Sequence, residues 1–265
     1  MTDTPADQPI SALRTGHDHL VALVHSLPTD ALNGPSGASE WTIAQVLSHL
    51  GSGAEIGLAA VRSSIDGAGK PADDFNQSVW DRWNAKTPPE QAHDFMIANE
   101  KLVRRYENLD EQARTTAEID LGFLPAPVPV GTAASFRLNE YALHARDIEV
   151  PGNPAALVSA DAVEPLLEVL PILIGWVGKP ADVLDGRAVT VGVGITSPDR
   201  DFGLAITDKV ALTDVPPAPD ASLSLPAESW LRLAYGRLAP ESTPPEVSVA
   251  GALTLDEFRR VFPGF

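Results

Sequence analysis

The 265-residue chain has 36 acidic and 19 basic residues, a formal net charge of −17 and no cysteine. The charge argues against nucleic acid or an anionic membrane as a partner, and the lack of cysteine excludes disulfides, thiolate metal ligands and a protein thiol nucleophile. No apolar run approaches the ~20 residues that span a bilayer, and MTDTPADQPI lacks the features of a signal peptide. We therefore expect a soluble cytoplasmic protein, a monomer or small homo-oligomer, that acts on small molecules.

The first part of the chain is predicted to be helical. Four long helices favour a bundle, and the proline-rich segment before the last of them predicts a loop or short extended structure. Ser39 or Thr42 could cap the second helix. The apolar periodicity predicts these helices, with one shorter piece, at about 8 to 27, 42 to 66, 73 to 84, 89 to 109 and 132 to 149.

A domain boundary is predicted near residue 150, because Pro151 and Pro154 end the fourth long helix. This gives a first domain at 1 to 150 and a second at 151 to 265. Alternating β-branched residues and helical periods together predict an α+β fold for the second domain. Its helices are expected at 159 to 178, 227 to 238 and 254 to 262, and its strands at 187 to 195, 203 to 214, 221 to 226 and 245 to 251.

One face of the fourth long helix carries three ionisable groups. In RLNEYALHARDIEV, Glu140, His144 and Asp147 recur at offsets of zero, four and seven, which share one stripe of a helix. Charges turned toward a bundle interior must be paired or bound to metal. Glu140 and His144 could converge on one cation, and His49, which interrupts the apolar face of the second helix, could supply a third ligand.

Ordinary explanations compete with a metal site. An exposed Glu and His one turn apart can be a solvated pair worth about a few tenths of a kcal/mol. His49 could equally be a hydrogen-bonded core residue, and Gln45 could support it or be an ordinary amide. His17 and His19 lie about 160° apart on a helix, so we expect them in solvent rather than on one metal.

Three segments resemble the mycothiol-dependent maleylpyruvate isomerase family over nearly the whole chain. They are SEWTIAQVLSHL at 39 to 50, NEYALHARDIEV at 139 to 150, and LRLAYGRL at 231 to 238 followed by the terminal VFPGF. The resemblance implies a DinB-like four-helix bundle in the N-terminal half. It also implies a C-terminal α+β domain similar to sterol-carrier domains.

The same resemblance implies a site and a reaction. A zinc ion, or another divalent metal, would be held by His49, Glu140 and His144. Mycothiol, a low-molecular-weight thiol, would occupy the open metal position and attack a small electrophile such as maleylpyruvate. The enzyme would then be an isomerase or a thiol S-transferase, and the motifs do not separate the two.

Two further residues are candidates for contact with the thiol or the substrate. Asp147 could hydrogen-bond a ligand or the incoming thiol, or could be a solvated carboxylate at the helix end. Arg237 matches the arginine that the family brings from its second domain, where a guanidinium could bind a carboxylate. Arg232 is a second choice, and either arginine could instead form a surface ion pair.

Two other functions stay open on the sequence. A zinc hydrolase would use the same ligands to activate water instead of a thiol. A non-catalytic carrier of small molecules would rely on the α+β half. Metal analysis separates the carrier from the two enzymes, and thiol dependence separates the enzymes from each other.

Overall fold

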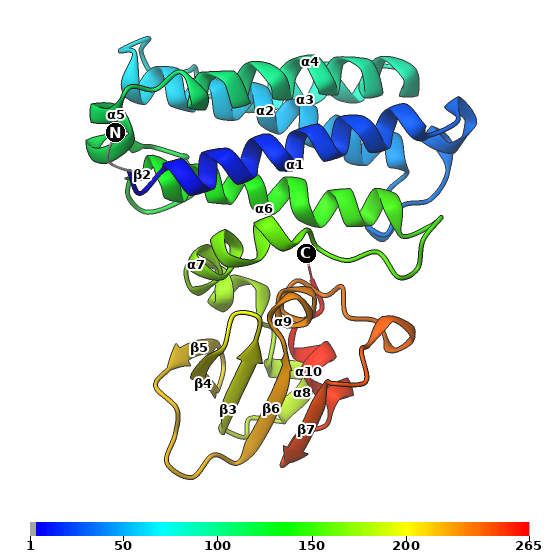
Figure 1. The fold of residues 1–265 in the computed structure, drawn as a ribbon, viewed down its shortest axis with the longest axis vertical. Helices are drawn as coiled ribbons and strands as arrows, with labels where there is room; N and C mark the ends of the chain where they lie inside the picture. The colour runs from blue at the N-terminus through cyan, green and yellow to red at the C-terminus, as the bar shows by residue number, and fades with distance from the viewer. Residues whose placement is uncertain (1–3, 265) are drawn as a thin grey trace. The chain divides into compact units, whose positions relative to one another are not determined.

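A helical unit, Met1–Pro165, is followed by a unit that contains a five-stranded sheet, Leu166–Phe265 (Figure 1). The computed structural model describes residues 4 to 264, apart from the side chains of residues 181 and 182. The segment after the last bundle helix stays with the first unit, because Arg146 Nε donates to the Ala156 carbonyl at 3.0 Å. The first unit therefore extends beyond the proline-containing segment at which we predicted the boundary.

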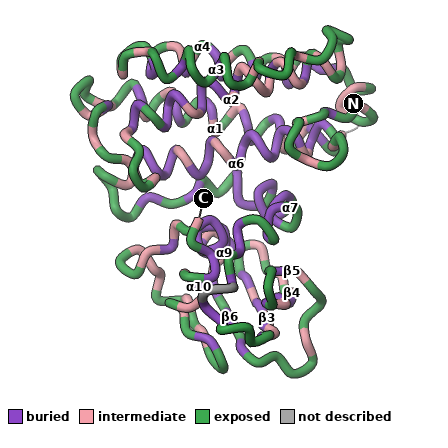
Figure 2. Tube along the Cα trace, turned by 180° about the vertical axis from the view of Figure 1, so that it is seen from behind, coloured by how far each residue is buried: buried purple, intermediate pink, exposed green. Residues whose placement is uncertain are grey.

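Four long helices form the first unit, as the periodicity predicted, and two shorter α-helices and one 3₁₀ helix lie between them within residues 4 to 149. The elements are α1 (Asp7–Ser26), the 3₁₀ helix η1 (Thr29–Asn33), α2 (Ile43–Ile65), α3 (Phe75–Asn84), α4 (Pro88–Glu107), α5 (Glu111–Thr116), β1 (Glu118–Ile119), β2 (Val128–Pro129) and α6 (Val130–Glu149). Helix α1 packs against α6, and α2 packs against α4 and α6. Buried residues run along α1, α2 and α6, which places the core between them (Figure 2).

Helix α2 begins at a capping box. The Thr42 hydroxyl accepts from the Gln45 backbone N–H, and the Gln45 side chain accepts from the Thr42 backbone N–H at 2.8 Å. These bonds satisfy backbone donors that have no partner inside the helix. Of the two caps that we predicted, the structure therefore uses Thr42.

Helices α2 and α3 approach closely at a glycine. A Cβ placed on Gly51 would lie 2.1 Å from the ring of Trp83, a distance that no side chain tolerates. Trp83 is fully buried, and its indole N–H donates to Glu55 Oε1 at 3.0 Å. The absence of a side chain at Gly51 thus allows α3 to pack on the surface of α2.

The second unit joins one mixed sheet to short helices. Helix α7 (Ala160–Val177) runs from the first unit into the second. The elements that follow are α8 (Ala181–Leu184), β3 (Val189–Thr196), β4 (Arg200–Ile206), β5 (Val210–Thr213), β6 (Ala221–Pro226), α9 (Ala227–Ala234), the 3₁₀ helix η2 (Pro240–Ser242), β7 (Ser248–Gly251) and α10 (Leu255–Val261).

The sheet has the strand order β5-β4-β3-β6-β7, in which β3 and β6 are parallel and the other neighbours are antiparallel. Alternate residues of β3 are buried, as expected for a strand with one face on a core. Trp230 of α9 packs against Phe202 and Phe262, with ring centroids 5.5 and 5.7 Å away. These aromatic rings form part of that core.

Two of the predicted elements have different bounds in the structure. The segment 203 to 214 forms parts of two strands, because a tight turn at Thr207–Lys209 reverses the chain between β4 and β5. Helix α9 ends at Ala234 rather than near residue 238, since Gly236 takes a left-handed conformation with φ of 71°. In the described part of the chain, no helix is long and apolar enough to cross a membrane.

Candidate metal centre

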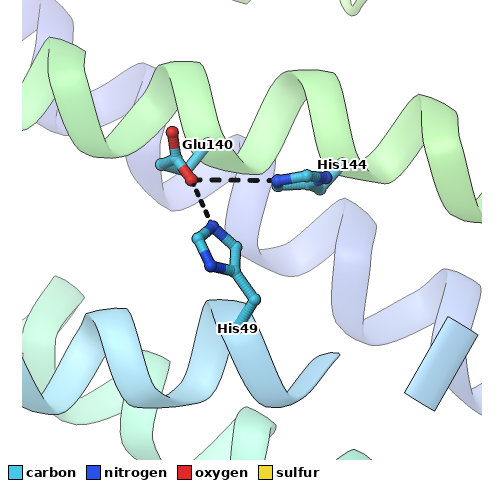
Figure 3. A group of neighbouring side chains, drawn as sticks. All are labelled: His49, Glu140 and His144. Atoms are coloured by element: carbon cyan, nitrogen blue, oxygen red, sulfur yellow. Dashed lines mark hydrogen bonds and ion pairs between the residues drawn. The ribbon is translucent and has the colours of Figure 1, made fainter. Parts of the chain in front are cut away.

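Three potential ligands from two helices meet inside the first unit. His49 lies on α2, and Glu140 and His144 lie one turn apart on α6, with their side chains pointing toward one another (Figure 3). The Nε2 atom of His49 is 2.7 Å from Glu140 Oε2, and Nε2 of His144 is 3.8 Å from the same oxygen. One ligand atom from each residue lies within 4.8 Å of the other two.

This spacing fits a single divalent cation. Zinc bonds of about 2.0 to 2.1 Å place neighbouring ligand atoms of a tetrahedral site about 3.3 Å apart. The separations of 2.7 and 3.8 Å lie on either side of that value, so small side-chain rotations would suffice. Two imidazoles and one carboxylate form a zinc-type set that leaves a fourth position open. His49 and Glu140 are about one-third exposed, so a small molecule can reach them.

Asp147 supports the cluster from behind His144. Its carboxylate is fully buried, and Oδ2 accepts a hydrogen bond from His144 Nδ1 at 2.9 Å. A neutral imidazole that donates from Nδ1 carries its lone pair on Nε2, the atom that faces Glu140. Of the two sequence hypotheses for Asp147, a solvated carboxylate is therefore wrong, and the hydrogen bond goes to a candidate ligand.

Trp41 covers the two histidines, a role that the sequence reasoning missed. Its ring is nearly parallel to that of His144, with centroids 6.3 Å apart and 19° between the planes, and lies 5.3 Å from that of His49. The preceding loop is fixed to α6, because the Gly37 N–H donates to the Asp147 carbonyl at 2.6 Å. Trp41 is 39% exposed, so it forms part of the wall between the cluster and solvent.

Electrostatics favour a charged Glu140. Desolvation raises the pKa of this carboxyl, but the hydrogen bond with His49 and the attraction of His144, His49 and Arg137 outweigh it and hold the pKa below its usual value. Arg137 is itself buried, one turn before Glu140 on α6. Its guanidinium donates to the Leu50 carbonyl and to Asn99 Oδ1, and it lies over the ring of Tyr141.

Other histidines and Gln45 lie outside the cluster. Gln45 is exposed and its side chain caps α2, so it does not support His49. The prediction that His17 lies in solvent is wrong, because α1 packs against α6 and places its ring 6.4 Å from that of Tyr141. His19 and His25 are exposed.

The two arginines of the C-terminal motif have different environments. Arg232 is fully buried, with Nε 2.7 Å from Glu228 and Nη1 2.9 Å from the Ser242 carbonyl, so it stabilises the second unit and is not a surface residue. Arg237 follows α9 and is half-buried, with Nη1 2.9 Å from the Tyr235 carbonyl. A role for Arg237 in binding thiol or substrate stays a prediction.

The family model described as the mycothiol maleylpyruvate isomerase N-terminal domain matches residues 13 to 149, more than half of the chain and the whole of the candidate metal centre. The chain belongs to the mycothiol-dependent maleylpyruvate isomerase family. The resemblance inferred from the sequence motifs is thereby confirmed.

Solved structures share the fold of this family member over nearly its whole length. The crystal structure of the mycothiol-dependent maleylpyruvate isomerase matches with a TM-score of 0.66 and 13% identity, covering 96% of this chain and 98% of that chain. A mutant of that enzyme with one histidine replaced by alanine gives a TM-score of 0.67 at 12% identity, with the same coverage. A search of curated proteins finds no match. The predicted combination of a helical bundle with a C-terminal α+β domain is confirmed.

Proposed function

We propose that this chain is a metal-dependent enzyme that uses mycothiol as its thiol cosubstrate and a small electrophile, such as maleylpyruvate, as its substrate. The observation that carries the proposal is the convergence of His49, Glu140 and His144 within 4.8 Å, in a chain that belongs to this family. The chain has no cysteine, so a reactive thiol has to come from outside. A bound zinc ion would lower the pKa of a thiol in the fourth position and make the thiolate available at neutral pH.

The protein's own side chains prepare this site. Asp147 holds the Nδ1 proton of His144 and so directs the Nε2 lone pair toward the ligand position. The pKa of Glu140 lies below its usual value, so the ionised carboxylate supplies a negative charge that favours a divalent cation. Trp41 shields one side of the histidine pair.

The chemistry begins when a thiolate adds to an electrophilic carbon of the substrate. In an isomerase the thiolate forms a carbon–sulfur bond to the conjugated cis double bond, whose electron pair moves onto the carbonyl oxygen as an enolate. The resulting single bond rotates, and collapse of the enolate restores the double bond and expels the thiolate. In an S-transferase the carbon–sulfur bond persists in the product. We propose that Arg237 binds an anionic group of the thiol or the substrate, as a guanidinium can do in bidentate fashion.

Turnover by the zinc-loaded protein, with and without mycothiol, tests the proposal. We expect maleylpyruvate to isomerise only when both zinc and mycothiol are present. Consumption of mycothiol with other electrophiles, but no isomerisation, would indicate an S-transferase. Turnover without thiol would support the water-activating alternative, and no turnover under any condition would support a carrier.

A metal-site variant and a matched control variant test the ligand assignment. His49→Ala should lose zinc and turnover together, because His49 is the ligand that α2 contributes. His25→Ala replaces an exposed histidine of α1 and should keep both. Full turnover by His49→Ala would remove this histidine from the proposed site.

A further inference from the structure

Apart from the candidate metal centre, the first unit has a pocket between α2, α3, α4 and the α2–α3 loop. It has a volume of about 770 Å³, within the roughly 300 to 1,000 Å³ of pockets that bind small molecules. None of its lining residues belongs to the candidate metal cluster. The pocket is therefore a separate feature of the helical unit.

Apolar side chains form the floor of this pocket. Leu58 and Ala59 of α2, Phe75 and Trp83 of α3, and Ile97 of α4 line it. Ile97 is 44% exposed, although it is a large aliphatic residue. Leu58 and Trp83 are already buried, so the apolar body of a ligand would cover the exposed parts of Ala59, Phe75 and Ile97 and gain about 25 cal/mol for each Å² removed from water.

The charges at the pocket are unusual for so acidic a chain. Four of its 19 basic residues line it, Arg62, Lys70, Lys86 and Lys101, together with two acidic residues, Glu55 and Asp94. Both acids already have cationic partners. Glu55 pairs with Arg82 at 2.8 Å, and Asp94 pairs with Lys86 at 2.5 Å.

Three cations at the pocket have no acidic partner among the described side chains. The exposed side chains of Arg62, Lys70 and Lys101 form no salt bridge or hydrogen bond with any side chain that the structure describes. These three cations lie beside the apolar floor of the pocket and form a local positive region. This region contrasts with the chain as a whole, which carries 17 negative charges in excess. Such a region attracts an anion.

We propose that this pocket binds a small amphipathic anion. The apolar body would rest on Ala59, Phe75 and Ile97. A carboxylate, sulfonate or phosphate group would bind Arg62, Lys70 and Lys101. The size of the pocket and the strongly negative chain favour a small molecule over an extended polyanion, which the rest of the surface would repel. This proposal is independent of the metal centre.

Two fluorescent probes that differ in charge test the proposal on the full-length protein. Anilinonaphthalene sulfonate carries an apolar ring system and one negative charge, and N-phenylnaphthylamine has similar rings without the charge. The variant Arg62→Gln/Lys70→Gln/Lys101→Gln should bind the sulfonate about tenfold more weakly, if each exposed charge contributes about 0.5 kcal/mol. Its affinity for the uncharged probe should stay within about twofold of the unmodified protein.

A variant of equal net charge is the matched control. Lys179→Gln/Lys209→Gln/Arg260→Gln removes three exposed cations from the second unit. The net charge of the protein, and with it the long-range electrostatic force on the anionic probe, therefore changes equally in both variants. The control should keep the affinity for the sulfonate within about twofold. Equal weakening in both variants, or unchanged affinity in the pocket variant, would overturn the proposal.

Two further measurements test the chemical class of the ligand and the location of its binding site. Decanoate should displace the sulfonate probe, whereas decanol at the same concentration should displace it much less, because it lacks the charge. Ile97→Gln should lower the affinity for both probes, since it removes the exposed apolar surface of the pocket floor. Equal displacement by decanol, or full binding of both probes by Ile97→Gln, would contradict an amphipathic anion site here.

Discussion

The carboxylate of Asp147 accepts a hydrogen bond from Nδ1 of His144 at 2.9 Å, and this carboxylate is fully buried. The bond leaves Nε2 of His144 to face Glu140 and His49. A carboxylate behind a histidine ligand fixes its tautomer and raises its basicity. This one relationship explains why an acidic side chain is buried at the end of the helical stripe.

Asp147→Asn should therefore weaken zinc binding about 10- to 100-fold without removing a ligand. The amide keeps the shape of the carboxylate but loses its charge, so the imidazole becomes a poorer donor. Competition with a chromophoric chelator measures the affinity, and far-ultraviolet circular dichroism checks the fold. Glu149→Gln, at the end of the same helix, should leave the affinity unchanged. Unaltered zinc affinity in folded Asp147→Asn would show that the bond is only structural.

Trp41 should report metal binding through its fluorescence. Its ring lies 5.3 and 6.3 Å from the two histidine rings, so a cobalt ion bound there should quench its emission. Titration with cobalt should quench the unmodified protein, and Trp41→Phe should lose most of this change. Trp80→Phe replaces another exposed tryptophan and should keep it. Equal quenching in Trp41→Phe would place the metal elsewhere.

Arg137 should contribute strongly to the stability of the bundle. Its guanidinium donates to Asn99 Oδ1, which Arg137→Leu would leave buried without that donor, and to the Leu50 carbonyl, which also accepts from Asn99 Nδ2. The expected cost is about 2 to 4 kcal/mol of unfolding free energy, measured by urea denaturation. Arg104→Leu breaks an exposed ion pair with Glu100 and should cost less than about 1 kcal/mol. Similar losses in both variants would contradict this account of Arg137.

Arg237→Ala should impair catalysis while the metal stays bound. A charged hydrogen bond contributes about 1.5 to 3 kcal/mol, which corresponds to a loss of about 10- to 150-fold in kcat/KM. Zinc content should not change, because Arg237 is not a candidate ligand. Arg260→Ala, in α10 of the same unit, should have normal kinetics. Loss of zinc or of the fold in Arg237→Ala would assign the residue a structural role instead, and normal turnover would exclude it from the site.

Periodicity predicted the bundle well because its signals are local. Helix α2 was expected at 42 to 66 and spans Ile43–Ile65, and its Thr42 cap is encoded three residues before Gln45. The facing of His49 toward Glu140 follows from apolar stripes on two helices that must pack together. Spacing therefore indicated these residues as candidates, and the family resemblance favoured them over the ordinary explanations.

Tertiary contacts decide what periodicity could not predict. Trp41 lies before the start of α2, so no helical period places it over His144. Arg137 lies one turn before Glu140, but its acceptors come from two other helices. The early end of α9 depends on the left-handed Gly236, which the apolar pattern does not reveal.

Cobalt-loaded protein titrated with mycothiol tests the central claim most directly, because one absorption spectrum reports both the metal site and the thiol. Binding at His49, Glu140 and His144 should give the visible bands of four-coordinate cobalt. Mycothiol should then add an intense near-ultraviolet band from charge transfer between thiolate sulfur and cobalt, and His49→Ala should show neither feature. Cobalt bands that mycothiol leaves unchanged would contradict a metal-activated thiol, and the absence of any cobalt bands would contradict the metal centre itself.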